Sequence, residues 1–117
     1  MKDLLLSRLY AKHFVKKQLT ANIKNCKLKI ENLIVAYEPI WAIGTGRNDT
    51  PADASEMAQF IKMSLVIGHK FQVRVLYGGS VNSKNAKSFI KSSGIDGLLV
   101  GGASLKLKEF DKIIKSR

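Results

Sequence analysis

The chain has 117 residues, of which 45% are hydrophobic and 25% are charged, which is the composition of one globular domain. No apolar stretch is long enough to span a bilayer, and the apolar run near the first residue is shorter than the roughly 7 to 15 residues of a signal peptide. We therefore expect a cytoplasmic protein with no membrane partner. The single cysteine, Cys26, excludes an internal disulfide and has no metal-ligand neighbours, so we predict no metal and no cofactor.

The chain is strongly basic, with twenty Lys and Arg residues against nine Asp and Glu and a formal net charge of +11, which raises nucleic acid as a partner. The basic residues are spread along the whole chain, however, and no basic block is interleaved with aromatic side chains for base stacking. Solvated helix faces explain the charge better, and a positive field would also attract an anionic phosphate substrate. We expect no specific nucleic-acid partner.

The first predicted element is an amphipathic helix over residues 9–23. Its apolar positions recur four residues apart, at Ala11, Val15, Leu19 and Ile23, and the lysines lie off this stripe. His13 lies among the lysines, and we interpret it as a surface histidine rather than a catalytic one. The polar segment 22–32 is the expected exit from this helix.

The next predicted element is a strand at residues 33–35, an apolar β-branched run without alternation that is typical of a strand buried on both faces of a parallel sheet. It leads to Glu38. A carboxylate in an apolar setting costs several kcal/mol or takes a raised pKa, so Glu38 is a candidate functional residue.

The residues after Glu38 have the pattern of a lid. Pro39 sets the direction in which the chain leaves the strand. An apolar run closed by glycines follows, typical of a loop that buries its face over a ligand: Ile40, Trp41, Ala42, Ile43, Gly44, Thr45 and Gly46. By spacing alone, an ordinary strand-to-helix connection with a buried tryptophan is favoured.

Two further strand-and-helix pairs are predicted, and each strand ends on a pair of glycines. Thr50 and Pro51 predict the start of a helix whose inward face continues to Leu65, and the next strand, residues 73–77, runs into Gly78-Gly79-Ser80. A paired glycine there lets backbone N–H groups approach a phosphate closely, although a plain turn would have the same sequence.

The second glycine pair, Gly101-Gly102, lies in the sequence between the last two predicted helices. A helix over residues 82–93 is predicted before the last strand, residues 98–100, which runs into residues 101–105. A closing helix carries Phe110, Ile113 and Ile114 inward. One helix followed by three strand-helix units predicts an α/β fold that is part of a (β/α)8 barrel, whose active site lies at the carboxyl ends of the strands.

Three motifs at those strand ends resemble the triosephosphate isomerase family. They are Glu-Pro-Ile-Trp-Ala-Ile-Gly-Thr-Gly from Glu38, Tyr-Gly-Gly-Ser from Tyr77, and Gly-Gly-Ala-Ser-Leu from Gly101. The resemblance is strong over residues 33–105 and weak before them, and the family usually has proline where Leu107 stands. A full barrel needs about 250 residues, so the resemblance implies one incomplete barrel domain over 1–117. Residues 1–32 would be a helix and linker, and 33–117 a βαβαβα half-barrel.

The resemblance implies a role for each matching residue. Glu38 would be the general base that interconverts dihydroxyacetone phosphate and glyceraldehyde 3-phosphate, the isomerase reaction of glycolysis and gluconeogenesis. The substrate phosphate would be held by Gly44, Ser80, Gly101 and Gly102. Tyr77 would bond the closed lid, which shuts out water and protects the intermediate.

The resemblance also implies what this chain lacks. No segment resembles the family's histidine, lysine and asparagine motifs, which lie in its N-terminal half. Three parallel strands alone would leave sheet edges bare, so we expect a poorly stable chain and a complementary N-terminal half-barrel, or a homodimer as in the family. The alternatives are an inactive remnant, a phosphate-binding scaffold fragment and a basic nucleic-acid-binding module.

Overall fold

The structure, a computed structural model, describes residues 2–24, 32–39, 49–66 and 72–117. The helices are α1 (Lys2–Lys24), α2 (Pro51–Val66), α3 (Ala86–Ile90) and α4 (Leu107–Ile114), and the strands are β1 (Asn32–Tyr37), β2 (Gln72–Tyr77) and β3 (Gly97–Leu98). A 3-10 helix, Gly102–Leu105, joins β3 to α4. This order confirms the predicted α/β fold of one helix followed by three strand-helix units.

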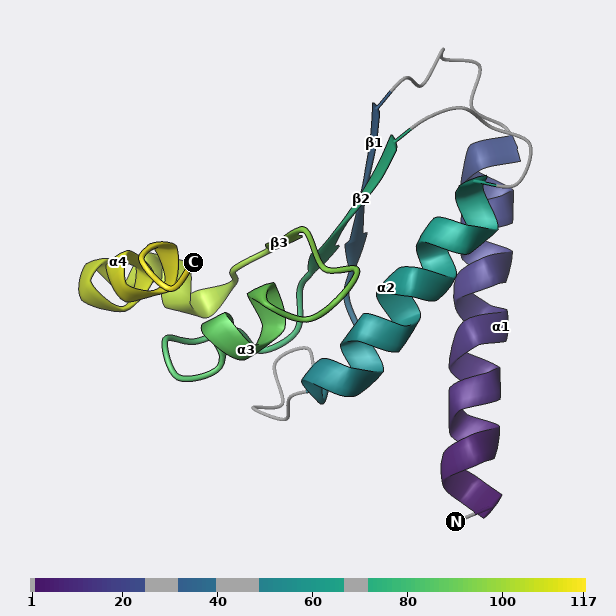
Figure 1. Cartoon of the computed structure of the whole chain (residues 1–117), viewed down its shortest axis with the longest axis horizontal. Coiled ribbons are helices and arrows are strands. Elements are labelled where there is room, and N and C mark those ends of the chain that lie inside the picture. The colour runs from purple at the N-terminus through teal and green to yellow at the C-terminus, as the bar shows by residue number, and fades with distance from the viewer. Residues whose placement is uncertain (1, 25–31, 40–48, 67–71) are drawn as a thin grey trace.

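The strands form a parallel sheet in the order β1-β2-β3 (Figure 1). Tyr37 lies opposite Tyr77, and Tyr77 lies opposite Leu98. The ladder continues past the strand ends, because the Gly78 N–H donates to the Tyr37 carbonyl at 2.8 Å and the Leu99 N–H donates to the Tyr77 carbonyl at 2.8 Å. The segments after all three strands therefore leave the sheet at the same edge.

The core lies between the sheet and α2, and α1 runs along α2 (Figure 1). Tyr77 is buried with its ring stacked on Phe89, with 4.1 Å between the ring centroids. The predicted inward face of α2 is confirmed, because Ala54, Met57, Ala58, Ile61 and Leu65 are all buried. The predicted stripe of α1 is also confirmed, since Ala11, Val15, Leu19 and Ile23 pack against the core.

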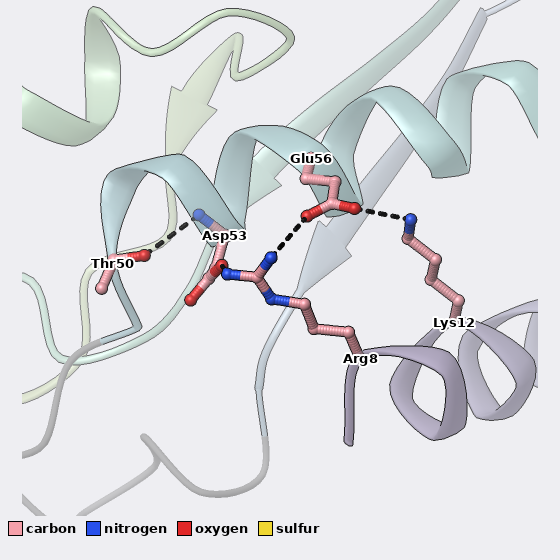
Figure 2. A network of polar contacts seen from close by, with 5 residues as sticks. All are labelled: Arg8, Lys12, Thr50, Asp53 and Glu56. Carbon is pink, nitrogen blue, oxygen red and sulfur yellow. Dashed lines mark hydrogen bonds and ion pairs between the residues drawn. The ribbon is translucent and has the colours of Figure 1, made fainter. Parts of the chain in front are cut away.

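The first turn of α2 is capped and joined to α1 by polar contacts (Figure 2). The Thr50 hydroxyl accepts the Asp53 N–H at 3.1 Å, which confirms the predicted N-cap. Arg8 of α1 pairs with Asp53 at 2.8 Å, and Lys12 pairs with Glu56 at 2.7 Å. Exposed ion pairs of this kind contribute only about 0 to 1 kcal/mol each, so they fix the position of α1 more than they stabilise the fold.

The prediction that the strand at 33–35 is buried on both faces is wrong for the sheet described here. Along β1, Ile34 is 60% exposed and Ala36 is exposed, whereas Tyr37 is buried. β2 alternates in the same way, with Arg74 exposed and Val75 buried. The reason is that α2 covers one face of the sheet, and in the described part of the chain no element covers the other.

Three element boundaries also differ from the predictions. α1 begins at Lys2 rather than near residue 9, because the preceding Leu and Arg residues also favour helix. α3 spans only Ala86–Ile90, because the side chains of Asn82 and Asn85 bond backbone N–H groups in the turn before it. The last strand spans only Gly97–Leu98.

The buried face of the closing helix, α4, also differs from the prediction. Ile113 is buried and Phe110 is half-buried, but Ile114 is 49% exposed. Neighbouring residues of a helix point about 100° apart, so Ile113 and Ile114 do not both face the core.

In the described part of the chain, none of the helices combines the length and the apolar character that a membrane span needs. Within the same residues, no group of three or more His, Cys, Asp or Glu side chains is arranged to hold a metal ion.

Candidate functional site

A cleft of about 440 Å³ lies at the carboxyl edge of the sheet. It is lined by Glu38 after β1, by residues 78–82 after β2 and by residues 99–103 after β3. We call residues 78–85 the β2 loop and residues 99–106 the β3 loop. The volume is that of a small-molecule site, and each of the three strands contributes to its walls.

Glu38 lies directly against the β2 loop. A Cβ atom built on Gly78 would lie 2.9 Å from the Cγ of Glu38 and 3.4 Å from the Cβ of Leu99. Any side chain at position 78 would therefore force the Glu38 side chain to move from its place at this edge. Glu38 is exposed, so the apolar surroundings expected for its carboxylate are not present among the described residues. Pro39, the next residue, is fully buried.

The two glycine pairs differ in what surrounds them. A Cβ atom on Gly79 would overlap the hydroxyl oxygen of Tyr77, so the backbone passes directly over that tyrosine. At Gly101 and Gly102, in contrast, no atom of the described residues lies within 4 Å of the position a Cβ atom would take. The first pair is thus required by packing, while the second borders open space in the cleft.

Side chains and turns hold both loops in place. In the β3 loop, the Gly101 carbonyl accepts the Ser104 N–H at 2.9 Å and the Ser104 hydroxyl at 2.6 Å. In the β2 loop, Asn85 donates through Nδ2 to the Ser80 carbonyl at 2.8 Å. Its Oδ1 accepts the Asn82 N–H at 2.9 Å. The loops are therefore ordered by their own bonds before any ligand arrives.

The Tyr77 hydroxyl lies on the buried side of this edge, where it accepts the Asp49 N–H at 3.2 Å. Asp49 is only 7% exposed, and among the described residues its Oδ2 has no hydrogen-bond partner. Burial, and then the Asp53 carboxylate, raise the pKa of Asp49 to about 6, while the Thr50 N–H and Arg8 oppose this. Burial raises the pKa of Tyr77 to about 12.

The structure brings some of the predicted site residues together and not others. Glu38, Ser80, Gly101 and Gly102 line the same cleft. Pro39 and Tyr77 are buried, and Tyr77 contacts Asp49, the first described residue after the predicted lid. The predicted lid residues Ile40, Trp41, Ala42, Ile43, Gly44, Thr45 and Gly46 lie outside the described residues.

Sequence reasoning missed three residues at this edge: Asp49, Asn85 and Glu109. The Glu109 carboxylate in the first turn of α4 accepts the Ser83 N–H at 2.6 Å, which joins α4 to the β2 loop. The dipeptide Asp49-Thr50 before Pro51 could have marked a helix start with two capping residues. Nothing in the spacing of Asn85 or Glu109 predicts their partners.

The family model that matches this chain and the known proteins similar to it point to the same family. The family model described as triosephosphate isomerase matches residues 7–117. A triosephosphate isomerase of Candida albicans is 57% identical over 90 residues, which cover 74% of this chain and 36% of the relative. Those of Carboxydothermus hydrogenoformans and Zygosaccharomyces bailii are 54% and 50% identical, over 73% and 88% of this chain and 36% and 42% of their own lengths. The chain thus spans well under half the length of these relatives.

Proposed function

This chain belongs to the triosephosphate isomerase family, and we propose that it supplies the C-terminal portion of such an isomerase, with the general base, the lid and the phosphate site. The observation that supports this most directly is the shared cleft, which brings Glu38 together with the glycine pairs of two loops. An acid and two glycine-containing loops that line one small cavity suit a substrate that carries a phosphate and an exchangeable C–H proton.

In this proposal, Glu38 takes a proton from the hydroxyl-bearing carbon next to the carbonyl carbon and returns it to the former carbonyl carbon, while the hydroxyl proton passes from one oxygen to the other. The substrate is a phosphorylated triose, and its phosphate accepts N–H hydrogen bonds from Gly44, Ser80, Gly101 and Gly102. The open space at the Cβ positions of Gly101 and Gly102 supports this, because no side chain of the described residues blocks the approach of a phosphate to this part of the backbone.

The lid and the base depend on each other. Glu38 is exposed in the described residues, and a carboxylate in water is a weak base towards a carbon acid. A cover made of Ile40, Trp41, Ala42 and Ile43 would exclude water from the cleft and strengthen every electrostatic contact inside it. The Tyr77 hydroxyl, through its contact with Asp49, would anchor the end of that cover.

We propose that the rest of the barrel comes from a complementary N-terminal half-barrel, in a cytoplasmic assembly that acts in glycolysis and gluconeogenesis. The uncovered face of the sheet, with Ile34 60% exposed, supports a missing opposite wall. The electrophilic histidine and the substrate-binding lysine and asparagine of the family would arrive with that half. Without these donors at the carbonyl oxygen, turnover would fall on the order of 10² to 10³ per donor.

The experiment combines this chain with an N-terminal portion of a relative and measures isomerisation. We expect turnover only from the combined sample, and Glu38→Gln should reduce it by several orders of magnitude because the amide is no base. An unchanged rate with Glu38→Gln, or no turnover in the combined sample, would contradict the proposal.

The second candidate is an inactive remnant or phosphate-binding scaffold, favoured by the exposure of Glu38. It predicts phosphate binding that Gly101→Asp abolishes, without turnover in any combination.

A further inference from the structure

The β2 loop, residues 78–85, contains a side-chain brace that its proposed function as a phosphate loop does not by itself require. Asn85 binds the Ser80 carbonyl through Nδ2 at 2.8 Å and the Asn82 N–H through Oδ1 at 2.9 Å. The Asn82 Oδ1 in turn accepts the N–H groups of Lys84 at 2.9 Å and of Asn85 at 3.0 Å. Two side-chain amides thus fix this turn where a helix or strand would use backbone bonds.

The brace acts on the backbone of Ser80. Because a peptide unit is planar, holding the Ser80 carbonyl fixes the orientation of the whole Ser80–Val81 peptide and the position of the Ser80 Cα. Ser80 lines the cleft, next to Gly78 and Gly79. The Asn85 side chain therefore holds the part of the β2 loop that lines the cleft, although Asn85 itself does not line the cleft.

A second contact joins the β2 loop to the β3 loop, residues 99–106. The Glu109 Oε1 accepts the Ser83 N–H at 2.6 Å, and Glu109 lies in the first turn of α4, directly after the β3 loop. Hydrogen bonds from Ser83 hold the pKa of the Glu109 carboxyl below its usual range, so the acceptor is charged at neutral pH. This bond ties the β2 loop to the helix that follows the β3 loop, and it adds to the Leu99 N–H bond to the Tyr77 carbonyl at the base of the two loops.

We propose that Asn85 and Glu109 are positioning residues for the phosphate group, which hold the two loops at the separation where their N–H groups converge on one anion. This inference rests on the proposed function, because it needs a phosphate in the cleft. A ring of N–H donors binds an anion well only when it is ordered beforehand, since otherwise binding must also order the loops. Neither residue would touch the phosphate.

The test uses inorganic phosphate as the probe and the backbone amide signals of Ser80, Gly101 and Gly102 in the isotopically labelled full chain as the readout. Asn85→Ala removes both side-chain hydrogen bonds of the brace and should weaken phosphate binding about tenfold, because binding must then also order the loop. Its matched control is Ser88→Ala, since Ser88 is exposed on α3 and does not line the cleft. That variant should bind phosphate as the wild type does.

Glu109 offers a stricter comparison. Glu109→Ala removes the acceptor, whereas Glu109→Gln keeps an oxygen at the same place, so the first should weaken binding about fivefold and the second should restore it to within about twofold. Asp111→Ala removes the same charge from α4 at a residue paired with Lys115. If only charge mattered, Glu109→Ala and Asp111→Ala would both strengthen phosphate binding.

The possible outcomes distinguish a failure of the proposed phosphate site from a failure of the proposed positioning role of Asn85 and Glu109. A wild-type chain whose amide signals do not respond to phosphate would overturn the phosphate site, and the brace with it. A responding wild type with unchanged affinity in Asn85→Ala would overturn the brace alone. If Asn85→Ala does not unfold cooperatively, the comparison of Glu109→Ala with Glu109→Gln decides, and equal affinities would refute the proposal.

Discussion

Replacing Asp49 by asparagine should stabilise the chain above pH 6 and flatten the dependence of its stability on pH. Asp49 is 7% exposed, with an Oδ2 that meets no hydrogen-bond partner among the described residues. The groups that act on its carboxyl are the Asp53 carboxylate, the Arg8 guanidinium and the Thr50 N–H. The Asp49 charge in turn helps to raise the pKa of Tyr37 and of Tyr77.

The size of the effect follows from the raised pKa. The pKa of Asp49 rises from 3.8 in the unfolded chain to about 6 in the folded chain. The difference is about two units, which corresponds to roughly 3 kcal/mol at most. Between these two values the folded state binds more protons than the unfolded state, so stability falls as the pH rises through this window. Above it, the whole penalty of a buried charge is present.

The assay is urea unfolding followed by far-ultraviolet circular dichroism between pH 4 and pH 8. Asp49→Asn should gain little over the wild type near pH 4 and about 1 to 3 kcal/mol above pH 6. Asp111→Asn, a change at an exposed acid on α4 that pairs with Lys115, is the control and should change stability by less than about 1 kcal/mol at each of these values. A gain for Asp49→Asn that is the same at pH 4 and pH 8, or absent at both, would show that the buried Asp49 charge does not lower stability.

Three further predictions concern the cleft edge and the sheet. Gly79→Ala should cost about 1 to 3 kcal/mol, because its Cβ atom would overlap the Tyr77 hydroxyl, whereas Gly101→Ala should stay within about 0.5 kcal/mol, as urea midpoints would show. Burial alone would raise the pKa of Asp96, but the Lys62 ammonium at 2.7 Å and the Val75 N–H outweigh it and lower the pKa. Lys62→Met should therefore destabilise the chain near neutral pH and less so in acid, where the wild type loses this contribution as the pH falls through the folded pKa. Ile34→Glu should leave the unfolding of the isolated chain unchanged but block its assembly with a complementary half, measured by size-exclusion chromatography; normal assembly would contradict the proposed interface.

The sequence was informative where local patterns decide the structure. Helical spacing predicted the buried face of α2 at Met57, Ile61 and Leu65, and the Thr50 cap followed from a side chain that bonds the backbone three residues later. Parallel strands bring their carboxyl ends to one edge, so the order of the elements predicted that Glu38 and the glycine pairs would meet. These inferences need only neighbours in sequence or the topology of the sheet.

The sequence was less informative where contacts join distant residues. The Glu109–Ser83 bond spans 26 positions, and the Asp49–Tyr77 bond spans 28. No periodicity marks such pairs. The short α3 has a different cause, because asparagine side chains compete with helical backbone bonds, and a hydrophobic pattern does not record that competition.

β1 links the fold to the proposed chemistry through its exposed face. Its apolar residues 33–35 have the composition of a strand covered on both sides, yet Ile34 is 60% exposed because α2 covers one face only. Glu38 continues the same strand and is exposed as well. A surface that covered Ile34 would extend along β1 towards the cleft and take Glu38 out of water. The uncovered face of the sheet therefore accounts for both the exposed apolar side chain of Ile34 and the solvent around the Glu38 carboxylate, which as a base would need dry surroundings.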